Sequence, residues 1–220
     1  MRVDAILSEL KRQSNPRNVA GMARFGINPH RALGVSVATL RQLARRIGKN
    51  HSLALQLWNS GIHEARILAS VIDEPAKVTP RQMERWVRDF DSWDVCDQCC
   101  GNLFDKTPFA YRKAAAWSRR REEFVKRAGF ALMAALAVHD KETGDAAFIK
   151  FFPLIERAAI DDRNFVKKAV NWALRQIGKR NARLRRLAIA SARRIRRQDS
   201  RSARWITADA LRELTRRRCD

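Results

Sequence analysis

Residues 124–128 read Phe-Val-Lys-Arg-Ala, and residues 165–169, 41 positions further on, read Phe-Val-Lys-Lys-Ala. Helix pairs that recur at such spacing are typical of HEAT and armadillo solenoids. The repeat is short, but the expected helix lengths and the short links between helices agree with it. The sequence therefore predicts an all-α superhelix of HEAT-like repeats, in which one helix of each pair lines a concave face.

Apolar periodicity and helix-start signals set the expected helices on both sides of this repeat. They span 3–13, 16–24, 36–47, 51–59, 62–73, 80–90, 92–104, 108–118, 121–138, 144–159 with a possible kink at Pro153, 162–177, 181–197 and 207–217. Breakers at Gly26, Asn28-Pro29 and Gly34 predict a loop or a badly broken helix over 25–35. The inner helices would be 36–47, 62–73, 92–104, 121–138, 162–177 and 207–217.

Composition limits the class of protein. Lys and Arg number 45 against 23 Asp and Glu, a formal charge of +22 that indicates a polyanionic partner, above all nucleic acid. A membrane surface is the competing polyanion, but no apolar run is long enough to cross a bilayer and no N-terminal signal core is present. Three of the four cysteines lie within 96–100, unlike a secreted disulfide framework, which predicts a reduced, cytoplasmic protein. We expect one domain over 1–220.

The most basic region runs from 179 to 218, with fifteen Lys or Arg and three acids. An apolar stripe persists through it, so it predicts amphipathic helix rather than a disordered tail. The arginines expected to bind phosphates there are Arg183, Arg186, Arg193, Arg194 and Arg197. RNA would satisfy the same charges as DNA.

Residues 92–97, Ser-Trp-Asp-Val-Cys-Asp, carry the chemistry that stands out. Ser92 is a suitable helix N-cap, and Trp93 and Asp97, four residues apart, then share one helix face. An indole face and a carboxylate together attract a cationic, electron-poor group. The alternative is structural, with Trp93 in the core and Asp97 paired with an arginine.

Charged and aromatic residues recur in comparable parts of the expected inner helices. They are Arg66, Trp93, Asp97, Arg127, Lys168 and Trp172. A basic concave groove of this kind fits a curved duplex, with Arg and Lys neutralising phosphates. The alternative is a solvated cationic face, which the number of arginines disfavours.

Four motifs, in order and spacing, resemble the HEAT-like-repeat DNA alkylation-repair glycosylases over residues 1 to about 200. They are Met22-Ala23-Arg24-Phe25, Leu33-Gly34-Val35, Ser92 to Asp97 and Phe165 to Arg175. The resemblance implies a superhelix that holds double-stranded DNA and excises cationic N3- and N7-alkylated purines without flipping the base into a pocket. The family's functional Trp, Asp, Arg and Trp match Trp93, Asp97, Arg127 and Trp172.

The resemblance also assigns roles to these residues. Asp97 would stabilise positive charge on the deoxyribose and position water, the two tryptophans would pack against the sugar and backbone, and Arg127 would hold a phosphate. Lys168 and Arg175 belong to the same motif and are expected to bind DNA. No cofactor, membrane or obligate protein partner is implied, and we expect a monomer near the nucleoid.

One departure from the family concerns residues 26–30. Active members have a DNA-contacting helix after the Met-Ala-Arg-aromatic motif, whereas Gly-Ile-Asn-Pro-His is poorly suited to a helix, and Phe25 replaces a common Tyr. This resembles a branch with a loop there, so non-catalytic DNA binding is the alternative function. A protein-binding HEAT scaffold is a third, disfavoured by the charge.

The remaining polar clusters predict no further site. Cys96, Cys99 and Cys100 share a helix face but have no fourth ligand nearby in the sequence, so we expect buried, inert thiols rather than a metal site. A redox pair is less expected, because no βαβ pattern surrounds it. The four histidines show no ligand spacing.

Overall fold

The computed structural model describes residues 2–216. Met1 and residues 217–220 lie outside the described residues, as do the expected end of the last helix at 217 and of the basic region at 218. Residues 2–216 form α-helices and two short 3-10 helices with no strand, so the all-α prediction is confirmed.

Contacts divide the chain into two compact units, Met1–Thr107 and Pro108–Asp220, and each is described by itself. The expectation of one domain over 1–220 stays a prediction. The first unit contains α1 (Val3–Arg12), α2 (Pro16–Arg24), α3 (Val37–Ile47), α4 (His51–Asn59), α5 (His63–Ile72), η1 (Pro75–Lys77), α6 (Pro80–Arg88), α7 (Trp93–Asn102) and η2 (Phe104–Lys106).

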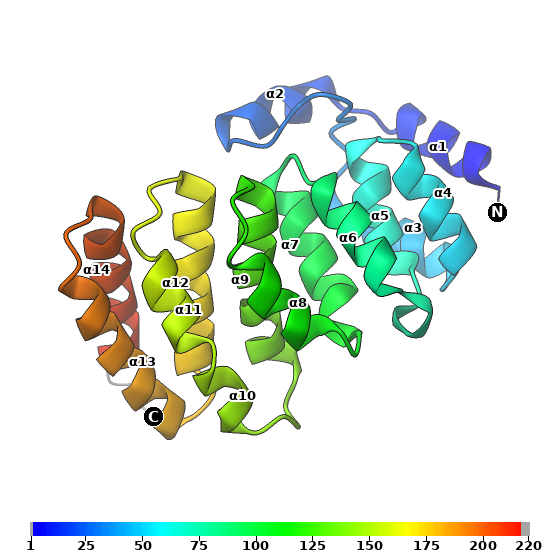
Figure 1. Ribbon diagram of the computed structural model, residues 1–220. Coiled ribbons are helices and arrows are strands. Elements are labelled where there is room, and N and C mark those ends of the chain that lie inside the picture. Colours follow the sequence, from blue (N-terminus) through cyan, green and yellow to red (C-terminus); the bar gives the residue numbers. More distant parts are fainter. Residues whose placement is uncertain (1, 217–220) are drawn as a thin grey trace. The chain divides into compact units, whose positions relative to one another are not determined.

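The first unit has two layers of helices. Helices α3, α5 and α7 pack side by side in that order, and α4 packs on α5 (Figure 1). In the second layer, Trp58 of α4 stacks on Trp86 of α6, with ring centroids 3.9 Å apart and planes 3° from parallel. Both indoles are almost completely buried, so this pair forms the centre of the layer.

The second unit repeats the arrangement. It contains α8 (Ala110–Trp117), α9 (Glu123–His139), α10 (Asp145–Ile149), α11 (Phe152–Ala158), α12 (Asn164–Gly178), α13 (Ala182–Arg196) and α14 (Arg201–Thr215). Helices α9, α12 and α14 form a row, while α8 packs on α9 and α11 and α13 pack on α12 (Figure 1). Helix α13 also packs on α14. The predicted alternation of inner and outer helices therefore holds inside each unit.

The sequence repeat corresponds to a real structural equivalence. Phe124 near the start of α9 and Phe165 near the start of α12 stack on one another, with ring centroids 5.5 Å apart. Successive repeats thus meet through the same position of their inner helices, as expected for stacked repeat units.

Two expected helices differ from the structure. The stretch 144–159 forms α10 and α11 instead of one kinked helix, and Pro153 lies in the first turn of α11, where a missing N–H is tolerated. Helix α14 begins at Arg201 rather than 207, because the Ser200 hydroxyl accepts hydrogen bonds from the backbone N–H groups of Ser202 and Ala203. The arginine-rich segment expected as a connection is the first turn and a half of this helix.

One expected helix start is wrong, and one expected N-cap makes no capping hydrogen bond. Thr107 does not cap a helix, since its hydroxyl donates to the Phe104 carbonyl, and α8 starts at Ala110. Ser92 occupies the N-cap position of α7 but makes no capping hydrogen bond; its hydroxyl donates to Asp94 at 2.6 Å. In both cases the hydroxyl donates to an oxygen two or three residues away and accepts no hydrogen bond from a helix N–H group.

We predict that Gly129→Ala destabilises the protein by about 1–3 kcal/mol, measured as the free energy of urea unfolding. A Cβ at Gly129 in α9 would lie 2.4 Å from the backbone nitrogen of Ser118, and backbone cannot move aside cheaply. The matched control is Gly21→Ala in α2, where nothing lies within 4 Å of the added carbon. That variant should gain up to about 1 kcal/mol from helix propensity; equal effects would contradict the packing argument.

Candidate functional site

Helix α7 presents Trp93 and Asp97 away from its buried side. Its core-facing residues are Val95, Cys96, Cys99 and Cys100. Trp93 and Asp97 are both half-buried, so Trp93 is not a core tryptophan. The pair therefore keeps access to solvent, as binding of an external cationic group requires.

The loop predicted at 25–35 lies against the starts of α5 and α7. The Trp93 indole N–H donates to the Phe25 carbonyl at 3.0 Å, and the Asn28 amide donates to Asp91 at 2.9 Å. At the other end of the loop, the buried Glu64 carboxylate accepts from the backbone N–H groups of Leu33 at 2.8 Å and Gly34 at 2.6 Å. The loop is thus anchored at both ends to the first unit.

Two features fix the shape of this loop. Gly34 has φ +76°, and a Cβ there would lie 2.3 Å from the Asn15 carbonyl oxygen, so only glycine fits. At the loop's start, Phe25 is 73% exposed beside the Trp93 indole that binds its carbonyl. The segment that departs from the resembled family is therefore an ordered loop with an exposed aromatic ring next to Trp93.

Asp94, next to Trp93, forms a buried polar network with α5. One carboxylate oxygen accepts from Ser92, and the other lies 2.8 Å from Nε2 of His63, which is only 4% exposed. Burial opposes protonation of His63, but the hydrogen bond and charge of Asp94 outweigh it and raise the pKa of His63. Burial likewise opposes ionisation of Asp94, yet the His63 hydrogen bond lowers its pKa. This pair locks the start of α7 onto α5.

In the second unit, Arg127 is buried, with 5% of its surface exposed. Its guanidinium donates from Nη1 to the Phe165 carbonyl at 2.6 Å, which joins α9 to α12. Trp172 is half-buried and Lys168 is exposed, and both lie on α12 opposite its buried residues Val166, Ala169 and Ala173.

Arg175 and Arg66 are engaged within the fold. Arg175 pairs with Glu213 and lies 3.4 Å from Asp209, both on α14. Arg66 donates to the Asp89 carbonyl at 2.9 Å, and its guanidinium lies over the Trp58 ring at 5.4 Å from the centroid. Its guanidinium therefore contacts the second layer of the first unit, and its DNA-binding role stays a prediction.

The C-terminal arginines lie in the other layer of the second unit from Lys168 and Trp172. Arg183, Arg186, Arg193, Arg194 and Arg197 all belong to α13 or follow it directly, and all are exposed. Arg194 is bound by Glu156 through both Nε and Nη2. Their DNA-binding role stays a prediction, but they do not share the row formed by α9, α12 and α14.

The cysteines of α7 are buried. Burial raises the pKa of the Cys99 and Cys100 thiols well above the usual value, which keeps them protonated. Among residues 2–216, no cluster of His, Cys, Asp or Glu has the arrangement of a metal site.

The structure adds a hollow beside α3, lined by basic and apolar side chains, that the sequence did not predict. Arg41, Arg45 and Lys49 line a hollow of about 340 Å³ between α3 and α5 of the first unit, together with Ala44, Gly48 and Val71. Lys49 also donates to the carbonyls of Val71 and Asp73 at the end of α5. In the sequence, the i, i+4 spacing of Arg41 and Arg45 indicates that both lie on one face of the helix.

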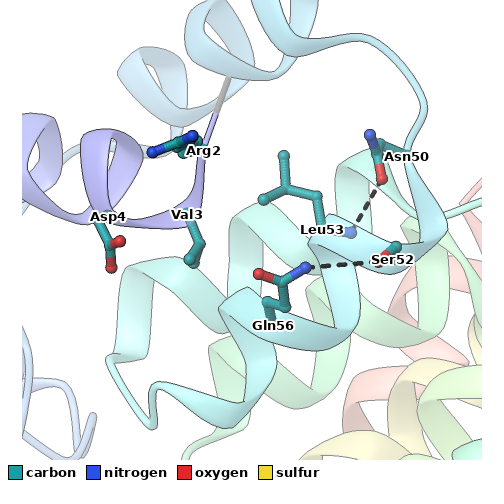
Figure 2. Close-up of a pocket in the computed structure, with 7 residues that line it drawn as sticks. All are labelled: Arg2, Val3, Asp4, Asn50, Ser52, Leu53 and Gln56. Atoms are coloured by element: carbon teal, nitrogen blue, oxygen red, sulfur yellow. Dashed lines mark hydrogen bonds between the residues drawn. The ribbon is translucent and has the colours of Figure 1, made fainter.

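Another pocket, of about 390 Å³, opens beside the starts of α1 and α4 (Figure 2). It is lined by Arg2, Val3, Asp4, Asn50, Ser52, Leu53 and Gln56. The Asn50 side chain there accepts from the Leu53 backbone N–H, and Gln56 donates to Ser52 (Figure 2). Its polar groups thus serve the first turns of α4, and none of the predicted site residues lines it.

The sequence pattern of the family described as "DNA alkylation repair enzyme" matches residues 6–214. The chain belongs to this family. Two relatives, Uncharacterized protein Lin0241 of Listeria innocua serovar 6a and Uncharacterized protein Lmo0209 of Listeria monocytogenes serovar 1/2a, are 26% and 25% identical over 131 residues. Each match spans 58% of this chain and 58% of the relative's length.

A solved structure shares the fold of this DNA alkylation repair family member. It is described as "a new family of proteins related to the HEAT-like repeat DNA glycosylases with affinity for branched DNA structures". The superposition has a TM-score of 0.81 at 18% identity and covers 97% of this chain and 96% of that one. The expected HEAT-like fold is therefore confirmed. Within residues 2–216, no helix combines the length and apolar character needed to cross a membrane.

We predict that His63→Gln lowers the free energy of unfolding by about 2 kcal/mol at pH 6, because a buried charge-assisted hydrogen bond is lost. The raised pKa of His63 means that its stabilisation is fully present below the unfolded value of 6.5 and declines as pH rises through the folded pKa. Urea unfolding of both proteins from pH 5.5 to 9 should show their difference shrinking with rising pH. A constant difference would refute protonation of His63 in the folded state.

Proposed function

We propose that this protein binds duplex DNA and hydrolyses the N-glycosidic bond of purines alkylated at N3 or N7. Family membership supports a role in alkylation repair. The observation that carries the proposal is the half-buried pair Trp93 and Asp97 on one face of α7, an indole and a carboxylate that retain access to solvent in a chain of charge +22.

Cleavage of this N-glycosidic bond requires mainly that the protein stabilise positive charge on the sugar. An N-alkylated purine is already cationic, so it leaves as a neutral base when the bond from its nitrogen to C1′ breaks. Positive charge then develops on the deoxyribose, and the Asp97 carboxylate would stabilise it and orient the water whose oxygen bonds to C1′. The products are the free base and an abasic site.

Further residues of each unit would hold the damaged strand. Trp93 and Trp172 would pack against sugar and backbone. Phosphates would bind to exposed Lys168 and, in the first unit, to exposed Arg41 and Arg45 on α3. Arg127 is proposed as the fourth active-site residue, and its bond to the Phe165 carbonyl gives it a fixed orientation. We expect the protein to act as a cytoplasmic monomer without a cofactor.

The loop at 25–35 favours a second candidate function, DNA binding without excision. This loop, anchored to α5 and α7, lies where active relatives are expected to have a DNA-contacting helix. The related solved protein is described as having affinity for branched DNA. On this alternative, Trp93 and Asp97 contribute to binding only.

We predict that the wild-type protein releases 7-methylguanine from methylated duplex DNA in a single-turnover assay with enzyme in excess, quantified by chromatography of the free base. Asp97→Asn should slow release by about 10²- to 10³-fold, because the developing charge loses its counter-charge. The matched control is Asp162→Asn, an exposed carboxylate just before α12, which should leave the rate unchanged.

The same assay separates the two candidates. Absence of release by wild type, together with salt-sensitive duplex binding, would favour the non-catalytic function. Release that is undiminished in Asp97→Asn would remove Asp97 from the mechanism. Failure to bind duplex even at low salt would exclude both.

A further inference from the structure

Helix α14 carries an exposed tryptophan that its own packing does not require. Trp205 is 41% exposed, while α14 buries Ala203, Ile206 and Ala210 on its other side. An exposed indole does not contribute the free energy that burial of its apolar surface would give. Large apolar side chains that stay exposed often mark binding surfaces.

Trp205 is paired with a cation from the neighbouring helix. The Lys167 ammonium lies over the indole, 5.3 Å from the ring centroid. Lys167 is adjacent on α12 to exposed Lys168, and Arg201 one turn before Trp205 on α14 is exposed as well. The indole therefore carries one cation over its ring and has exposed Arg201 one turn before it, while the Asp209 carboxylate one turn after it is paired with Arg212.

This combination fits one class of partner. Sites for single-stranded nucleic acid combine cations that follow the phosphates with aromatic rings on which bases stack. Bases inside a duplex are already stacked on each other and cannot cover an indole without unpairing. An exposed indole therefore gains its contact from a base that is unpaired already, while the cations hold the adjoining phosphates.

We infer that Trp205 and Lys167 form a stacking platform for an unpaired nucleobase where single-stranded DNA leaves a duplex. The inference rests on the proposed DNA binding but is independent of base excision. It assigns recognition of strand branching to the second unit and to two residues with no part in the proposed glycosylase chemistry.

The test compares three labelled DNAs by fluorescence anisotropy at one fixed salt concentration: a plain duplex, the same duplex with a five-nucleotide single-stranded arm, and the armed duplex with abasic sites throughout its arm. The two arms carry equal phosphate charge and differ only in their bases. Wild type should bind the base-bearing arm about tenfold more tightly than the abasic arm.

Trp205→Ala should abolish the preference for the base-bearing arm and leave the affinity for plain duplex unchanged. Trp205→Phe should retain part of the preference, because an aromatic face remains. The control is Ile160→Ala, which removes a comparably exposed apolar side chain, 57% exposed, just after α11 in the other layer. It should change none of the three affinities.

The possible failures are distinguishable. Equal wild-type affinity for the two arms, or a preference that persists in Trp205→Ala, would overturn the platform while leaving duplex binding and the proposed function intact. A Trp205→Ala variant that loses affinity equally for all three DNAs would show a general contact instead and also overturn it. Absence of binding to every DNA would overturn both this inference and the proposed function.

Discussion

Burial of α9 is the constraint on which the second unit depends. Every residue from Arg127 to Ala137 is buried, so the helix must be apolar on all sides and small where its neighbours approach most closely. Its alanines and Gly129 meet that requirement. The one charged residue in this stretch, Arg127, is tolerable only with hydrogen-bond partners, and the Phe165 carbonyl is one of them. The same packing that closes the core thereby fixes the orientation of a predicted functional side chain.

In the first unit, the loop between α2 and α3 also needs hydrogen-bond partners for its polar groups. The chain between α2 and α3 has no helix of its own, and its backbone groups are taken up by Glu64 and the Trp93 indole. Trp93 therefore has a structural bond as well as an exposed face. Its neighbour Asp94 is hydrogen-bonded to His63, and Asp97 is half-buried on the face of α7 that carries Trp93.

Much of this arrangement could be predicted from sequence because it follows from local signals. Apolar periodicity and the repeat at Phe124 and Phe165 predicted the helices and their alternation, and glycine and proline breakers predicted the loop at 25–35. Errors occurred where a hydroxyl had a choice between local partners: Thr107 donates to the Phe104 carbonyl instead of capping a helix, and Ser200 caps a helix inside a charged stretch. For the site residues, too, helical spacing predicted some positions, whereas side-chain contacts could be seen only in the structure. Lys168 and Trp172 follow from helical spacing, but only packing reveals that Arg66 and Arg175 are engaged by Asp89 and Glu213 and that the arginines of α13 lie in the other layer.

The parallel stack of Trp58 and Trp86 has a spectroscopic consequence. Two buried indoles 3.9 Å apart couple strongly and are shielded from water, as is buried Trp117. Their emission should therefore be blue-shifted and little affected by solutes that bind at the surface of the folded protein. The red edge of the intrinsic fluorescence comes from Trp93, Trp172 and Trp205, so selective excitation there reports on the surface of the protein without any attached dye.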